Sequence, residues 1–396
     1  MRSLEQHLDP SVTPKRILSL DGGGIRGVIT LQFLEKIETI LRKRHGDNPD
    51  FRLCHYFDLI GGTSTGAIIA AGLAIGMSVD EIKKKYEEFG QAIFKQPTSF
   101  AWLNKAILFF KSLGKGKFSN KPLEDKLQEV FKQIKLDDQT QIKTGLCMVA
   151  KRADTVSVWP INNHPKGKYY EDRHGEKGNG NKHIPLWKII RACTAAPSYF
   201  KPELIDVGDK SGFAAFIDGG VSQHNNPSLL LYLMATLKGY PFHWKSSKNE
   251  LFILSVGTGT HKKKDISKLY QRNFFRWADK LADFFMEDAS WFNQTIMQLL
   301  SDSPTCHHID SEIGDLNEDK PFGEQFTYIR YNAWLEEPKQ DELNIMLKPP
   351  LPFKNAQLVD MHEMSNVGAM VDMAKVGKIS ADFYVKEEHF LPIFDL

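Results

Sequence analysis

Cysteine is scarce in this sequence of 396 residues, which has only Cys54, Cys147, Cys193 and Cys306. No two of them stand in a CxxC pair, which excludes a zinc knuckle and is typical of a chain kept reduced inside the cell. Long hydrophobic runs are also lacking, since no uncharged apolar segment reaches the roughly 18 residues of a membrane span. The stretch MRSLEQHLDPSVTPKR has no apolar h-region of a signal peptide. We therefore expect a cytoplasmic protein that reaches a membrane only peripherally, at its inner face.

A strong charge of one sign is missing as well, because the net charge is +2. This balance argues against a dedicated binder of nucleic-acid polymers, which needs an extended positive field. The lysine clusters at 83–85 and 262–264 are more typical of solvated faces. What is present is an ordinary composition, 41% hydrophobic and 25% charged, as in a soluble protein with a sizeable core. The length predicts one large domain or two ordinary ones.

Strand, glycine turn and helix follow one another twice near the start of the chain. Residues 16–20, RILSL, predict a buried strand that ends at DGGGIRG, and residues 28–41 have the apolar spacing of a helix. HYFDLI predicts a second strand, and AIIAAGLAIG predicts a helix buried on all sides. This repetition predicts an α/β fold.

The later part of the chain changes in texture. LCMVAKR, TVSVWPI, GFAAFIDGG and NELFILSVGTGT predict further strands, whereas long helical patterns dominate from about residue 265. We therefore expect the sheet to end near residue 260. The prediction is a catalytic domain at 15–260 and a mainly helical C-terminal extension at 261–396, packed on the core.

The stretch FDLIGGTSTGAIIAAGLA places Ser64 between Gly62 and Gly66, with apolar segments on both sides. One interpretation is a tight turn made of small residues. The other is a nucleophile elbow, in which a strand turns sharply into a helix and presents the serine hydroxyl at the corner. The G-x-S-x-G pattern is short enough to arise by chance, so other motifs must decide.

The stretch DGGGIRG also has two interpretations. Gly22, Gly24 and Gly27 satisfy the G-x-G-x-x-G fingerprint of dinucleotide binding, but the acidic residue expected at the end of a second strand is missing where it should fall. Alternatively, the glycine N–H groups at a helix start form an oxyanion hole. Arg26 beside them would then hold the loop or bind an anionic head group, unless it is an ordinary surface arginine.

A serine nucleophile needs a base. Asp218 stands at the end of a predicted strand, directly before two glycines, and burial among apolar neighbours would raise its pKa and make it a better base. An aspartate in an ordinary turn is the alternative. Histidines that come into question for a third member are His55 and His224 near the motifs, and His261, His307, His308 and His389 later in the chain.

The ordered trio DGGGIRG, GTSTG and a distant DGG resembles the patatin-like phospholipase family, and RACTAAPSYFKP, GVSQHNNP and SVGTGT match it too. The resemblance covers about residues 15–260. It implies a three-layer α/β/α fold with a largely parallel central sheet, and hydrolysis of lipid acyl esters without a metal or an organic cofactor. The residues it assigns are Ser64 as the nucleophile, Asp218 as its partner in a dyad, Gly22, Gly23, Gly24 and Arg26 as the oxyanion loop, and Gly62 and Gly66 as the elbow glycines.

The resemblance also suggests how such an enzyme is used. A cytoplasmic core of this kind with a helical tail looks like the bacterial phospholipase effectors of anti-phage defence that cyclic dinucleotides activate; a constitutive lipase is the alternative. The substrate would be a phospholipid membrane surface, and the oligomeric state, a homodimer or larger when activated, is left open. Residues 101–117 have the pattern of an interfacial helix, or of one packed on the core. Candidates for gripping a nucleotide in the extension are Arg272, Arg276, Trp277, Arg330 and Tyr331.

Overall fold

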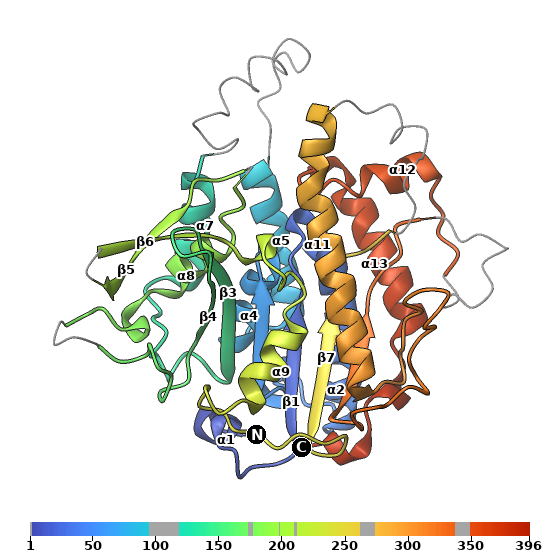
Figure 1. Ribbon diagram of the computed structural model, residues 1–396, viewed down its shortest axis with the longest axis horizontal. Helices are drawn as coiled ribbons and strands as arrows, with labels where there is room; N and C mark the ends of the chain where they lie inside the picture. Colours follow the sequence, from blue (N-terminus) through green and yellow to red (C-terminus); the bar gives the residue numbers. More distant parts are fainter. Residues whose placement is uncertain are drawn as a thin grey trace.

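A computed structural model of the chain shows how these segments are arranged (Figure 1). It describes residues 2–94, 119–172, 177–197, 199–209, 212–261, 274–336 and 349–396. The predicted interfacial helix at 101–117 lies outside these ranges.

A central sheet with the strand order β5-β6-β3-β2-β1-β7-β9-β8 runs through the molecule, and β4 pairs with β3. The strands from β3 to β8 in this order are parallel to their neighbours, whereas β4, β5 and β6 are paired in antiparallel fashion. Their bounds are β1 Lys15–Leu20, β2 Leu59–Thr63, β3 Gly145–Arg152, β4 Val158–Asn162, β5 Glu203–Asp209, β6 Gly212–Asp218, β7 Leu251–Val256, β8 Ser301–Asp302 and β9 Phe326–Tyr331.

Helices cover both faces of this sheet. The described helices are α1 Leu4–Leu8, α2 Gly27–Arg44, α3 Leu53–Tyr56, α4 Thr65–Ala74, α5 Val79–Phe94, α7 Lys121–Phe131, α8 Leu186–Cys193, α9 Ser228–Thr236, α11 Phe274–Leu299, α12 Asn355–Asp360 and α13 Met370–Tyr384. In Figure 1, α9 and α11 lie in front of the strands. Helices α2, α4, α8 and α13 contribute to the apolar core on the other face. The three-layer α/β/α fold with a largely parallel sheet is therefore confirmed.

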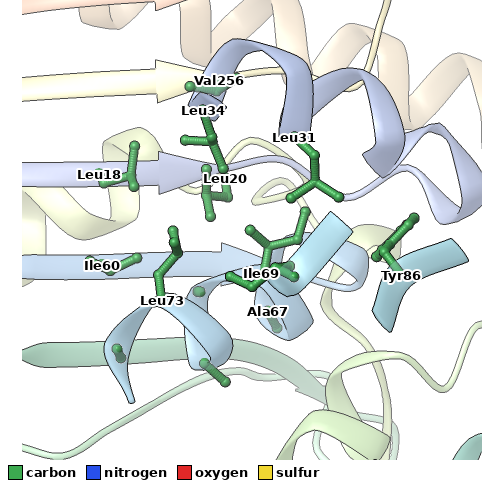
Figure 2. Close-up of a cluster of buried hydrophobic side chains, with 14 of the residues drawn as sticks. Leu18, Leu20, Leu31, Leu34, Ile60, Ala67, Ile69, Leu73, Tyr86 and Val256 are labelled. Carbon is green, nitrogen blue, oxygen red and sulfur yellow. The ribbon is translucent and has the colours of Figure 1, made fainter. Parts of the chain in front are cut away.

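Two apolar cores follow from this layering. Strand β1 is buried along its whole length, as expected for a parallel strand covered on both faces. Its Leu18 and Leu20 join the core on one face, while Ile17 between them joins the core on the other. Figure 2 shows the first core, where side chains of β1 and β2 meet those of α2, α4 and α5. This core fixes the two glycine turns at the carboxyl ends of β1 and β2.

The expectation that the sheet ends near residue 260 is wrong. Strand β9 pairs with β7 in parallel register, Phe252 with Thr327 through Val256 with Tyr331, and β8 extends the sheet further. FTYIRY is rich in aromatic and β-branched residues, a composition that favours strand, but it is short and follows a long helical pattern. The division into a catalytic domain at 15–260 and an extension at 261–396 stays a prediction.

None of the helices in the described part of the chain combines the length and the apolar character that a transmembrane segment needs.

Candidate active site

Ser64 stands alone between the end of β2 and the start of α4. Its backbone has φ 54° and ψ −123°, a region that non-glycine residues rarely adopt and that costs about 1–3 kcal/mol. A Cβ atom on Gly62 would lie 2.1 Å from the carbonyl oxygen of Gly66, and one on Gly66 would lie 2.3 Å from that of Leu20. The sharp turn therefore requires glycine at both positions, and it leaves the Ser64 side chain half-buried at the corner.

The Ser64 hydroxyl donates a hydrogen bond of 2.6 Å to Oδ2 of Asp218. The other carboxylate oxygen, Oδ1, accepts the N–H of Gly220 at 2.7 Å. Burial raises the pKa of Asp218 from 3.8 to about 6, while the hydrogen bonds from Ser64 and Gly220 lower it. A carboxylate with a pKa nearer to neutrality is the stronger base towards a hydroxyl.

Sheet register explains why two residues so far apart in sequence meet. Strand β3 lies between β2 and β6, and it pairs Val149 with Thr63 on one side and Ala150 with Asp218 on the other. Ser64 directly follows Thr63, so the serine and the aspartate lie at one level of the sheet with a single strand between them. The antiparallel direction of β6 brings its last residue to this level.

The glycine loop lies against the elbow. A Cβ atom on Gly22 would be 3.2 Å from the Cβ of Ser64. The N–H of Gly22 is donated to the carbonyl of Asn225 at 3.0 Å, and its own carbonyl accepts the Thr258 hydroxyl at 3.0 Å. Gly22 therefore allows the loop backbone to come close to Ser64. Its N–H is already bonded and is not available as an oxyanion donor.

The next two glycines differ from Gly22. Within the described residues, the N–H groups of Gly23 and Gly24 have no hydrogen-bond acceptor. Gly24 has a φ of +56°, which favours glycine, and the following N–H, that of Ile25, is donated to the carbonyl of Met364 at 2.9 Å. The loop packs against the elbow, and among the described residues it keeps two free donors while its other polar groups are held in place.

Arg26 is buried, with 7% of its surface exposed, in the short 3-10 helix Gly24–Arg26. The alternative of an ordinary surface arginine is therefore wrong, because the side chain of a surface arginine would be exposed to solvent. Arg26 also lies close to His362, whose pKa is lowered first by burial and then by this positive charge. Its position favours holding the loop.

Two residues that sequence reasoning missed hold the loop to the elbow. The carbonyl of Gly24 accepts hydrogen bonds from the Thr65 hydroxyl at 2.8 Å and from the Tyr86 hydroxyl at 2.5 Å. Thr65 is the residue after Ser64, and Tyr86 comes from α5. A tyrosine on the buried face of an amphipathic helix needs a partner for its hydroxyl, and that was the available signal.

Among the described histidines, those considered as a third member of the pair make other contacts. Within the described residues, the side chains of Ser64 and Asp218 bond to no histidine ring. The pKa of His224 is lowered to about 4 by burial, and His55 accepts the N–H of Arg52 instead. Of the late candidates, His261 stacks on His362, His307 lies against the carbonyl of Arg330, and His389 bonds to Tyr331.

The dinucleotide fingerprint of Gly22, Gly24 and Gly27 lacks its ribose-binding acid. Strand β2, the strand after α2, ends at the Ser64 turn and carries no acidic residue there.

Two candidates for nucleotide binding, Arg330 and Tyr331, are buried in β9 and bonded to protein groups. They do not offer a nucleotide a stacking face or a free charge. Arg272 lies outside the described residues. Among the described residues no group of three or more metal-binding side chains comes together.

A family model and several curated relatives match this chain. The family model described as Patatin-like phospholipase matches residues 18–232. A cGAMP-activated phospholipase of Escherichia coli is 30% identical over 61% of this chain and 62% of its own length, and one of Vibrio cholerae is 31% identical over 64% and 66%. Patatin group A-2 of Solanum tuberosum is 30% identical over 62% of this chain and 60% of its own. The matches thus span less than two thirds of these relatives.

Among solved structures, VipD from Legionella pneumophila matches with a TM-score of 0.33 and 15% identity over 92% of this chain and 67% of that one. Human GIVD cytosolic phospholipase A2 has a TM-score of 0.41 and 10% identity over 99% and 62%. The family model, by contrast, covers more than half of the chain. The chain belongs to the patatin-like phospholipase family.

Proposed function

We propose that this protein hydrolyses acyl ester bonds of membrane phospholipids, with Ser64 as the nucleophile and Asp218 as the base. The observation that carries the proposal is the 2.6 Å hydrogen bond from the Ser64 hydroxyl to Asp218 at a strained strand-to-helix turn. A serine and a base in hydrogen-bond contact are the pattern of an activated nucleophile. Family membership supports acyl hydrolysis as the chemistry, and the relatives named phospholipases support phospholipid as the substrate.

The reaction begins with acylation of the serine. Asp218 accepts the hydroxyl proton as Ser64 Oγ attacks the ester carbonyl carbon, and the carbonyl oxygen takes up the negative charge. We assign the free N–H groups of Gly23 and Gly24, in the loop that packs against the Ser64 elbow, as the donors that stabilise this charge. Donors of this kind are worth about 3 kcal/mol each in the barrier. The tetrahedral intermediate then expels the alcohol oxygen of the lysophospholipid, which takes the proton from Asp218.

Deacylation repeats these steps with water. Asp218, ionised again, accepts a proton from a water molecule that attacks the acyl-serine. The bond from the acyl carbon to Ser64 Oγ breaks, the serine regains its proton from Asp218, and the fatty acid leaves. One base therefore serves both halves of the reaction, which is consistent with the absence of histidine from the contacts of Ser64 and Asp218 in the described residues.

The test is release of fatty acid from phospholipid vesicles by the wild-type protein and by Ser64→Ala. We expect the variant to lose at least about 10³-fold in rate, as expected for removal of a nucleophile, to lose labelling by a fluorophosphonate probe, and to keep its circular dichroism spectrum. Ser11→Ala, in an exposed loop near the N-terminus, is the matched control and should retain both activities. Undiminished release by Ser64→Ala would contradict the assignment.

Activation by a cyclic dinucleotide belongs to the same proposal. It is supported by the two relatives named cGAMP-activated phospholipase, which are 30% and 31% identical to this chain. A constitutive lipid acyl hydrolase is the alternative, and it differs in one measurable respect, namely full activity of the purified protein without any nucleotide.

A further inference from the structure

Asp21 is the residue that joins β1 to the glycine loop, and its carboxylate is held by Arg330. Nη1 of Arg330 donates to Oδ1 at 2.8 Å and Nη2 donates to Oδ2 at 2.6 Å, so the contact is bidentate. Both side chains are 6% exposed. Bidentate pairs fix direction as well as distance, because the planar guanidinium matches the planar carboxylate.

Three neighbouring strands contribute to this contact. Asp21 follows β1, Ser255 lies in β7 and accepts a 2.8 Å hydrogen bond from Nη1 of Arg330, and Arg330 itself lies in β9. The backbone of Arg330 is anchored too, since its N–H is donated to the Thr305 hydroxyl at 2.9 Å. The guanidinium therefore has little freedom to move relative to the sheet.

Stability alone is a poor reason for such a pair. Burial by itself lowers the pKa of Arg330, and the Asp21 carboxylate raises it, so the guanidinium stays charged. Taking two charges out of water costs several kcal/mol per ion, and a well-packed apolar replacement is often as stable or more so. The ion pair provides a fixed orientation of the backbone that follows Asp21, which an apolar pair would not provide.

The group next in the chain is the loop with the two free donors. Asp21 is anchored at its backbone by an N–H bond of 3.1 Å to the carbonyl of Val256, and at its side chain by Arg330. Gly22, Gly23 and Gly24 follow without side chains of their own, so the direction of their N–H groups depends on the hydrogen bonds to the loop backbone and on how Asp21 is held where the loop begins. Arg330 lies outside the 18–232 range that the family model matches.

We propose that Arg330 is a positioning residue for the acyl-transfer reaction: it fixes Asp21 and thereby aims the N–H groups of Gly23 and Gly24 at the oxyanion. This inference rests on the proposed function of the same site. It assigns a residue beyond the matched family region to the reaction without any contact of that residue with the substrate.

Three variants test it on a soluble aryl ester. Arg330→Gln and Asp21→Asn should each lower kcat by about 10²-fold and leave KM within about twofold, because misplaced oxyanion donors affect the transition state and not substrate binding. The double variant should lose no more than the worse single one, because both changes break one contact. Inhibition by a trifluoromethyl ketone, which forms an oxyanion on Ser64, should weaken by the same factor as kcat.

Arg16→Gln is the matched control for the loss of a buried ion pair. Arg16 is fully buried in β1, the strand that Asp21 follows, and it pairs with Asp58 at 3.2 Å. It lies five residues before Asp21, roughly 16 Å away along the strand direction. It should lower the unfolding temperature and leave kcat unchanged. All rates are measured at a temperature where each variant is folded.

Should Arg330→Gln fail to fold, Arg330→Lys and Ser255→Ala decide the question. Lysine keeps the charge and loses the fork, and alanine removes one of the bonds to Nη1. Lowered kcat with unchanged KM in these variants supports the inference. A kcat equal to that of the wild type in the folded variants, or an equal loss in Arg16→Gln, would overturn it. If the wild-type protein itself fails to hydrolyse any ester, the proposed function has failed instead.

Discussion

Asp218 has to be ionised to accept a proton from Ser64, and its pKa therefore sets the acid limb of the reaction. Burial raises that pKa to about 6. We expect kcat/KM on a soluble ester to rise about tenfold per pH unit below pH 6 and to level off above it, since the raised pKa leaves the carboxyl protonated and inactive in acid. Initial rates between pH 4.5 and 8.5 check this. A flat profile down to pH 4.5 would show that Asp218 is not the base.

Residues within contiguous motifs were recognisable from the sequence, and residues that act from a distance were not. Ser64 and Asp218 each stand beside glycines in short patterns, and the structure brings them into contact. Tyr86 lies 62 residues from the glycine it holds, and Arg330 lies 309 residues from Asp21. The buried face of a helix marks Tyr86 as needing a partner, but no local pattern around either residue says which group that partner is. Only packing of the whole chain reveals such partners.

The hydroxyl of Tyr86 is the contact by which α5 holds the glycine loop, and its removal tests that role. Tyr86→Phe keeps the ring and deletes the hydrogen bond to Gly24, together with the 2.6 Å contact to the Thr65 hydroxyl. We expect kcat to fall about tenfold with KM unchanged, and stability to fall by about 1 kcal/mol, a typical net value for one hydrogen bond. Tyr384→Phe is the control, because the Tyr384 hydroxyl has no partner among the described residues. Equal kinetics of the two variants would contradict the role of Tyr86.

At the scale of elements, the elbow between β2 and α4 depends on the absence of a side chain at Gly62. A methyl group there would overlap the carbonyl of Gly66 at 2.1 Å, so Gly62→Ala should displace Ser64, lower activity at least about 10²-fold and destabilise the protein by about 1–3 kcal/mol. Gly239→Ala is the control, because no atom of the described residues lies within 4 Å of an added Cβ. The rates of ester hydrolysis and the thermal unfolding of both variants test this. Full activity of Gly62→Ala would refute the requirement for glycine at this position.

The sequence predicted most of the elements around the site, because their periodicity is strong. Strands β1, β2, β3, β4 and β7 fall where apolar runs predict them. Strand β9 was missed, because six residues of strand-forming character after a long helical pattern give too short a signal. The missed strand is the one that carries Arg330.

At the scale of the whole molecule, the glycine loop takes its anchors from segments spread along the chain. Val256 and Arg330 hold Asp21, Asn225 holds Gly22, and the carbonyl of Met364 holds Ile25. The last of these contacts comes from the segment between α12 and α13, within the region that the sequence assigned to an extension. A structural change in that region would therefore act on the glycine loop through the hydrogen bond between Ile25 and Met364.

Control of the activity is the property that the molecule as a whole would have to provide. A phospholipase in the same compartment as its host's membrane would damage that membrane unless it rested in a less active state. Two relatives at 30% and 31% identity are named cGAMP-activated phospholipases. We expect the purified protein to release little fatty acid from vesicles, and a matching cyclic dinucleotide to raise the rate at least about tenfold, because a ligand shifts such an equilibrium by its differential affinity for the two states.

A panel of cyclic dinucleotides, each compared with its linear counterpart, tests this expectation, and Ser64→Ala with the same nucleotides gives the background rate. The linear compounds carry the same bases and nearly the same charge, so activation by the cyclic form alone indicates recognition of its shape. Because the activator binds the folded protein, it should also raise the unfolding temperature of Ser64→Ala, in which no turnover occurs. Full activity of the wild-type protein without nucleotide, unchanged by every member of the panel, would make this protein a constitutive lipase.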